Sequence, residues 1–135
     1  MFDSYWMWAI LAVVSGAMLV GPFIQRRMLG IKEVDTLTAT QLMNHKDALV
    51  LDVREDSEIG QGRIPGARHI PVGKLADRVG ELAKYKGKPI VVACRSGNRS
   101  ASACATLKKQ GFGDVYNLKG GVIAWEQAGL PLEKK

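Results

Sequence analysis

After Gly30, short apolar runs rich in β-branched residues alternate with stretches of helical pattern, and this alternation constrains the fold more than any other feature. It is typical of a parallel sheet flanked by helices. The clearest strand is 48–53, whose near-continuous apolar character favours burial on both faces. Thr38 and Gln41 resemble a capping box and predict a helix start. We expect strands over 31–35, 48–53, 67–70, 89–93 and 114–118, and helices or helical turns over 38–45, 55–60, 73–85, 98–110 and 121–128.

A run of twenty residues without a charge, Tyr5 to Ile24, precedes this pattern. At ~1.5 Å per helical residue the run would reach across the ~30 Å hydrocarbon core of a bilayer. We therefore predict a transmembrane anchor over 5–24 within an N-terminal segment 1–30, followed by one domain over 31–135. Arg26 and Arg27 follow the run, so the positive-inside rule predicts a single-pass protein of a bacterial inner membrane with its domain in the cytoplasm. A cleaved signal peptide and a buried helix remain the alternatives.

Composition excludes some classes of function. The formal net charge is +6, but the basic residues are scattered and do not alternate with aromatic residues, so we expect no nucleic-acid partner. The chain has two cysteines, too few for a disulfide framework, which favours a reducing compartment. His45 and His69 share no metal-ligand spacing with the cysteines, and we expect neither a metal nor a cofactor.

Cys94 follows the apolar run 89–93, with Arg95 next to it and Arg99 five residues after it, and a helical segment begins at Asn98. A helix N-terminus and adjacent guanidinium groups lower a cysteine pKa from ~8.5 to roughly 3.5–7.5. In open α/β sheets, ligand sites lie beyond the carboxyl ends of the strands, where Cys94 would stand. The pattern predicts a reactive thiolate at this edge of the sheet.

The loop after Cys94 has the composition of an anion-binding cradle. Its backbone N–H groups can point at the sulfur, since Gly97 allows a conformation that a Cβ would resist. Arg99 is expected over the cradle, able to pair with an oxyanion, and Arg95 adds a second charge. Side-chain donors come from Ser96, Asn98 and Ser100. Such a site can bind an anionic sulfur donor, form a persulfide and pass the sulfur to a thiol or cyanide without a general base.

Phosphate chemistry is the main chemical alternative, because cysteine phosphatases also combine a cysteine, an N–H cradle and an arginine. They resemble one another in a Cys-x5-Arg spacing, whereas here the sixth residue after Cys94 is Ser100. The shorter Cys-x4-Arg loop favours sulfur chemistry over phosphatase or arsenate reductase activity.

Four ordered motifs resemble those of a single-domain rhodanese: residues 51–55 (Leu-Asp-Val-Arg-Glu), 58–71, 94–100 (Cys-Arg-Ser-Gly-Asn-Arg-Ser) and 117–125. The resemblance covers essentially all of 31–135. It implies a five-stranded parallel sheet flanked by helices and a persulfide-forming sulfurtransferase. By position, Cys94 would be the sulfur-carrying nucleophile, 95–99 the cradle, and Arg99 the residue that binds an anionic donor such as thiosulfate. Arg63 replaces a histidine that is frequent in the family, at a position that looks peripheral.

Several other residues have simpler interpretations. Asp52 and Arg54 end a strand at the same edge as Cys94, and we expect an ion pair that braces the strand end, with a catalytic pair as the alternative. Cys104 lies among alanines in its helix and is expected to pack in the core, not to resolve a disulfide. Trp125 is expected to be a core anchor. The alternative for the whole chain is a membrane-tethered rhodanese-fold binding module that recruits a protein partner.

Overall fold

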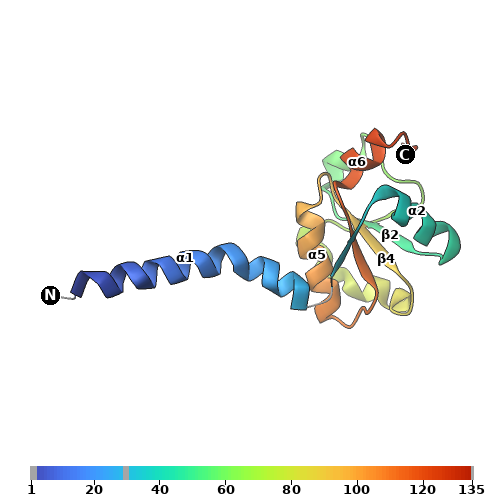
Figure 1. Cartoon of the computed structure of the whole chain (residues 1–135). Coiled ribbons are helices and arrows are strands. Elements are labelled where there is room, and N and C mark those ends of the chain that lie inside the picture. The colour runs from blue at the N-terminus through green and yellow to red at the C-terminus, as the bar shows by residue number, and fades with distance from the viewer. Residues whose placement is uncertain (1–2, 29–30, 135) are drawn as a thin grey trace. The chain divides into compact units, whose positions relative to one another are not determined.

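The computed structural model describes residues 3–28 and 31–134, and the side chains of 5–18 and 31–134. The chain divides into two compact units between residues 30 and 31. The first contains one helix, α1 (Asp3–Met28), drawn in blue in Figure 1.

A membrane span requires about twenty mainly apolar residues. Among the described residues, no helix is both long and apolar enough to cross a membrane. The transmembrane anchor predicted over 5–24 is therefore not supported, and the side chains of its residues 19–24 lie outside those described. The location of the protein stays a prediction.

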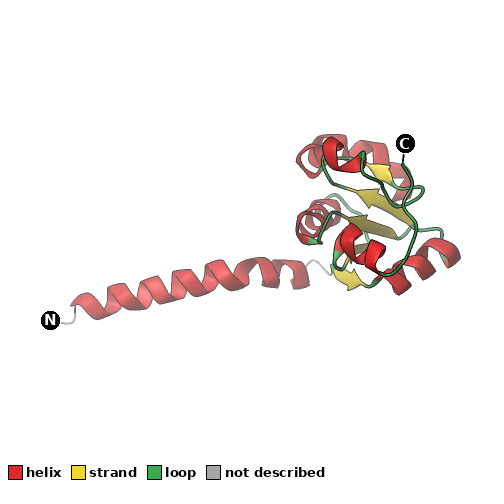
Figure 2. Ribbon diagram, turned by 90° about the horizontal axis from the view of Figure 1, so that it is seen from above, coloured by secondary structure: helices red, strands yellow, loops and turns green. Residues whose placement is uncertain are grey.

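The second unit is built on a five-stranded sheet of order β1-β5-β4-β2-β3, in which every neighbouring pair is parallel. Helices lie on both sides of this sheet (Figure 2). The predicted parallel sheet flanked by helices is thus confirmed. The strands are β1 (Lys32–Val34), β2 (Leu49–Asp52), β3 (Arg68–His69), β4 (Ile90–Ala93) and β5 (Val115–Leu118).

The central strand β4 is buried on both faces, so its side chains alternate between two cores. Ile90 and Val92 pack on one face with α4 (Leu75–Arg78) and α5 (Asn98–Lys109). Val91 and Ala93 pack on the other face with α2 (Thr36–His45) and α6 (Gly121–Gln127). Cys94 continues the alternation and belongs to the α5 face.

Two helix predictions are wrong in detail. The helix α2 begins at Thr36, because the Asp35 side chain accepts the Thr38 backbone N–H at 2.8 Å and caps the helix before the predicted Thr38 start. The predicted helix 73–85 is three short elements: η1 (Val72–Lys74), α4 and η2 (Val79–Tyr85). Gly73 and Gly80 lie in this stretch, and glycine disfavours a continuous helix. The helical turn expected at 55–60 is α3 (Asp56–Ile59).

Candidate active site

Cys94 lies at the carboxyl end of β4, where residues 95–97 lead into the first turn of α5. The parallel topology directs the carboxyl ends of β2, β4 and β5 to the same edge of the sheet. The residue is only 1 % exposed, so its sulfur lies at the bottom of the loop that follows it. This is the placement that the sequence predicted.

The loop turns a backbone donor toward the sulfur. Gly97, with φ of +107°, precedes α5 and donates its N–H to Cys94 Sγ at 3.0 Å. Burial raises the pKa of the Cys94 thiol, but hydrogen bonding around the sulfur, to which the backbone of Ser100, Gly97 and Ser96 contributes, outweighs burial and lowers the pKa below its ordinary value. The cradle therefore stabilises an anionic sulfur.

The side chains of the loop divide into exposed and buried groups. Ser96 and Asn98 are exposed, and within the described part of the chain their side chains make no hydrogen bond to the sulfur. Ser100 is fully buried, with Oγ 3.4 Å from Cys94 Sγ and 2.5 Å from Asn117 Oδ1, to which it donates. Asn117 Nδ2 in turn donates to the Gly97 carbonyl at 3.2 Å. Asn117 is thus a site residue to which the sequence reasoning assigned no role.

Arg99 is not free to face an incoming anion, which corrects the predicted arrangement. Its Nη1 and Nη2 donate to the two carboxylate oxygens of Glu58 at 2.6 and 2.8 Å. This hydrogen bonding lowers the pKa of Glu58 to about 2, so the carboxylate is ionised throughout the neutral range. Glu58 Oε1 also accepts the Glu55 backbone N–H at 3.0 Å, which fixes the carboxylate at the start of α3. The sequence reasoning gave Glu58 no role in the site.

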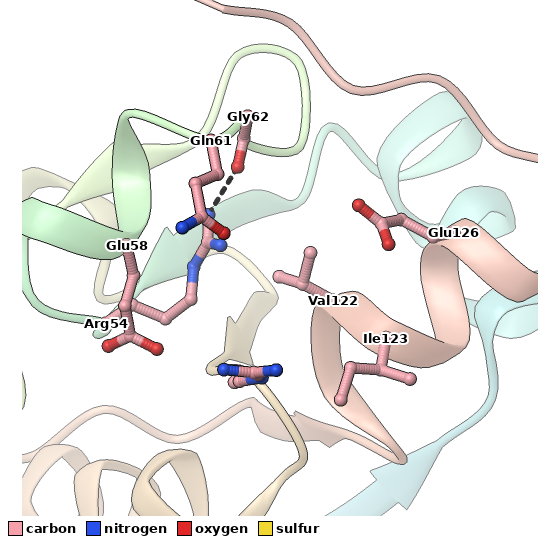
Figure 3. Close-up of a pocket in the computed structure, with 8 residues that line it drawn as sticks. Arg54, Glu58, Gln61, Gly62, Val122, Ile123 and Glu126 are labelled. Carbon is pink, nitrogen blue, oxygen red and sulfur yellow. Dashed lines mark hydrogen bonds between the residues drawn. The ribbon is translucent and has the colours of Figure 1, made fainter.

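Beside the cysteine loop lies a pocket of about 140 Å³ (Figure 3). Arg54 and Glu58 lie on one side, and Ile123 and Glu126 of α6 lie on the other. Arg95 also lines the pocket, is exposed, and makes no ion pair with any residue that the structure describes. Arg95 is therefore the loop guanidinium that is available to an anion arriving from solvent.

Asp52 and Arg54 form a buried brace at the end of β2. Arg54 Nε lies 3.0 Å from both carboxylate oxygens of Asp52, and Arg54 Nη2 lies 2.8 Å from Oδ2 and 2.8 Å from the Gly62 carbonyl. Asp52 is fully buried, and its partners fill its hydrogen-bonding capacity. This geometry favours the bracing interpretation over a catalytic pair.

The start of α6 packs directly on the cysteine loop. Val122 N–H donates to the Cys94 carbonyl at 2.8 Å, and Ile123 N–H donates to the Arg95 carbonyl at 3.1 Å. A Cβ at Gly121 would lie 2.6 Å from the Arg95 carbonyl carbon and closer still to the Cys94 carbonyl oxygen, so only glycine fits. The Gly120-Gly121 pair therefore lets α6 hold the loop in place.

The remaining candidate residues lie in the core or the periphery. Cys104 is fully buried among Ala103 and Leu107. Trp125 is 4 % exposed and donates Nε1–H to the Pro131 carbonyl at 2.8 Å, as expected of a core anchor. His69 Nε2 lies 2.6 Å from the Arg54 carbonyl. Within 3–28 and 31–134, no cluster of three or more metal-ligating side chains is present.

Comparison with known proteins identifies the family. The chain is 43 % identical over 103 residues to a protein named sulfurtransferase from Allochromatium vinosum, covering 76 % of this chain and 94 % of that protein. It is 40 % identical over 85 residues to a thiosulfate sulfurtransferase of Pseudomonas fluorescens, covering 63 % of this chain and 76 % of the relative. These names support a family of sulfurtransferases.

Solved structures agree. A rhodanese-like domain protein of Staphylococcus aureus superposes with a TM-score of 0.67 at 32 % identity, over 77 % of this chain and 98 % of that one. A protein of Rhodopseudomonas palustris, described as a "possible tyrosine phosphatase", gives a TM-score of 0.72 at 28 % identity, over 83 % and 93 % of the two chains. Residues 36–128 match the rhodanese-like domain. With its parallel sheet and its cysteine loop at the strand ends, this chain belongs to the rhodanese-like domain family.

Proposed function

We propose that the protein is a sulfurtransferase that carries sulfane sulfur as a persulfide on Cys94. The donor is an anionic sulfur compound such as thiosulfate, or a protein persulfide, and the acceptor is a thiol or cyanide. The observation that carries this proposal is the buried Cys94 Sγ, held at 3.0 Å from the Gly97 N–H with a pKa below that of an ordinary thiol.

The reaction balances without a cofactor. The Cys94 thiolate attacks the outer sulfur of thiosulfate, the S–S bond of the donor breaks, and sulfite leaves with the electron pair. An acceptor thiolate or cyanide then attacks the outer sulfur of the persulfide. The bond between Cys94 Sγ and the outer sulfur breaks, its electron pair stays on Sγ, and the Cys94 thiolate is regenerated. Both steps place negative charge on sulfur, which the N–H groups of the loop stabilise.

The charges around the loop bear on the class of donor. Arg99 is neutralised by the Glu58 carboxylate, and Glu126 lines the neighbouring pocket. Arg95 is the loop guanidinium exposed to solvent. A small dianion such as thiosulfate would therefore depend on Arg95 and be repelled by the two carboxylates, whereas a protein persulfide carries less charge. This arrangement favours a protein persulfide as the better donor.

Phosphatase activity, suggested by the description of the Rhodopseudomonas palustris neighbour, receives less support. The Cys-x5-Arg loop of cysteine phosphatases has an arginine six residues after the cysteine, whereas in this chain that residue is the fully buried Ser100. The arginine five residues after Cys94 is already paired with Glu58.

Intact-mass measurement tests the proposal. The purified chain is mixed in turn with thiosulfate, mercaptopyruvate and a cysteine desulfurase loaded with cysteine. We expect a gain of one sulfur atom that is absent in Cys94→Ser and retained in Cys104→Ser. Absence of the adduct with all three donors would contradict the proposal and favour a binding module that has kept the fold.

A further inference from the structure

The reactive sulfur is the first of three buried polar groups that are joined by hydrogen bonds: Cys94 Sγ, Ser100 Oγ and the Asn117 side-chain amide. Their residues are 1 %, 0 % and 3 % exposed, so water does not compete for their hydrogen bonds. The distances are 3.4 Å from Sγ to Oγ and 2.5 Å from Oγ to Asn117 Oδ1. Because each group has few donors and acceptors, the direction of each hydrogen bond can be deduced.

The Gly97 carbonyl fixes the orientation of the Asn117 amide. A carbonyl can only accept a hydrogen bond, so the Asn117 atom that faces it at 3.2 Å must be the amide nitrogen. The amide oxygen, which can only accept, therefore faces Ser100 Oγ. A serine hydroxyl has one proton, and that proton is committed to Asn117. The lone pairs of Ser100 Oγ then face Cys94 Sγ.

This arrangement matches only one form of the cysteine. A neutral Cys94 thiol can donate its S–H to Ser100 Oγ, and the chain of hydrogen bonds is then complete. A thiolate has no proton to donate and instead needs a donor. The Ser100 hydroxyl must then turn away from Asn117 toward the sulfur, leaving the Asn117 oxygen without its bond.

We propose that Asn117 is a positioning residue that holds the Ser100 hydroxyl in the direction that supports the neutral thiol of Cys94 and opposes formation of the thiolate. Asn117 thus acts against the N–H groups of the loop, which favour the anion. The result is a thiolate of higher basicity, and a more basic thiolate is the stronger nucleophile. The proposal rests on the proposed function only in taking Cys94 as the reactive thiol, because the ionisation of that thiol can be measured without any sulfur donor.

The charged groups near Cys94 stay constant in the comparison that tests this proposal. Arg95 and Arg99 come from its own loop and from α5, and Glu58 comes from α3. The Asp52–Arg54 pair closes the end of β2, and Glu126 of α6 lines the adjacent pocket. Replacing Asn117, which is uncharged and lies on β5, by another uncharged residue leaves all of these charges in place.

The test measures the pH dependence of Cys94 alkylation by iodoacetamide in the full chain, with Cys104→Ser throughout so that one thiol remains. Asn117→Leu, which has nearly the same shape, frees the Ser100 hydroxyl to donate to the thiolate. We expect the apparent pKa of Cys94 to fall by about half a unit to one unit, the size of one hydrogen bond. Asn117→Asp keeps an acceptor opposite Ser100 and adds a negative charge, so the pKa should rise.

Ser100→Ala supplies the matched control. In that background Asn117→Leu should no longer change the pKa, and the rise caused by Asn117→Asp should be smaller. If Asn117 only supports the loop, both Asn117 variants would loosen the N–H groups and raise the pKa, and Asn117→Leu would act the same with and without Ser100. A rise or no change for folded Asn117→Leu would overturn the proposal. If circular dichroism shows that Asn117→Leu does not fold, an equal rise for Asn117→Asp with and without Ser100 would overturn it.

Discussion

Replacing Glu58 by glutamine should make the protein a better user of thiosulfate. The substitution keeps the shape of the side chain but removes the charge that neutralises Arg99, whose two nitrogens lie 2.6 and 2.8 Å from the carboxylate oxygens. Arg99 then becomes available to a small anion, and one repulsive charge is lost from the rim of the pocket. A protein persulfide donor should be affected much less, because its reacting sulfur carries no sulfonate group.

The size of the effect follows from the ion pair. Hydrogen bonding to Arg99 lowers the pKa of Glu58 from 4.5 to about 2. That difference corresponds to about 3 kcal/mol at ~1.4 kcal/mol per pKa unit. The side chains of Arg99 and Glu58 are 35 % and 24 % exposed, so solvent screening reduces the interaction to roughly 1–2 kcal/mol. If Arg99 in Glu58→Gln interacts with thiosulfate by the same free energy, kcat/KM for thiosulfate rises by about 5- to 30-fold.

The assay is the rate of thiocyanate formation from cyanide, with thiosulfate varied in one series and a loaded cysteine desulfurase in the other. Glu126→Gln is the matched control, since it removes a carboxylate from the same pocket without releasing Arg99. A kcat/KM for thiosulfate that falls or stays unchanged in Glu58→Gln would contradict a role for the released Arg99, and so would an equal rise in Glu126→Gln.

Three further predictions concern stability and the second cysteine. Because the pKa of Glu58 is lower in the folded chain, its ion pair stabilises the fold above pH 4.5, and this contribution disappears as the pH falls from 4.5 to about 2. The stability of Glu58→Gln, measured by circular dichroism during acid unfolding, should therefore depend less on pH than that of the unsubstituted chain. The same pH dependence in both proteins would contradict this. Gly121→Ala should lower the free energy of unfolding in urea by roughly 2–4 kcal/mol, because the new Cβ would overlap the Cys94–Arg95 backbone. In Gly113→Ala the new Cβ would face open space, so the free energy of unfolding should change by less than about 1 kcal/mol. Equal losses in the two variants would disprove the close approach at Gly121. Cys104→Ser should keep full turnover but lose about 1–2 kcal/mol of stability, because a hydroxyl replaces a fully buried thiol. A loss of turnover in folded protein would show instead that Cys104 takes part in the reaction.

The sequence predicted those features that depend on local pattern. The strand over 89–93 could be located because a buried parallel strand is apolar along its whole length, and β4 is observed at Ile90–Ala93. The place of Cys94 followed, since the carboxyl end of a parallel strand is where α/β sheets expose their sites. The start of α2 was predicted wrongly because both Asp35 and Thr38 can cap a helix, and in the structure the Asp35 side chain accepts the Thr38 backbone N–H.

The sequence could not predict contacts between residues far apart in the chain. Glu58 and Arg99 are separated by 41 positions, and whether they meet depends on how α3 and α5 lie at the sheet edge. The direction of the Asn117 amide depends on the Gly97 carbonyl, 20 positions away. From the local sequence, Arg99 was expected to face an incoming anion, whereas in the fold its guanidinium is paired with the Glu58 carboxylate.

The central claim is that Cys94 carries the sulfur, and a single-turnover experiment tests it most directly. The chain is loaded with sulfur from thiosulfate, freed of excess donor, and treated with cyanide while thiocyanate and intact mass are both followed. We predict about one thiocyanate released per Cys94 persulfide lost, with none from Cys94→Ser and an unchanged yield from Cys104→Ser. Thiocyanate formation by Cys94→Ser, or a persulfide on Cys94 that cyanide does not remove, would contradict the account.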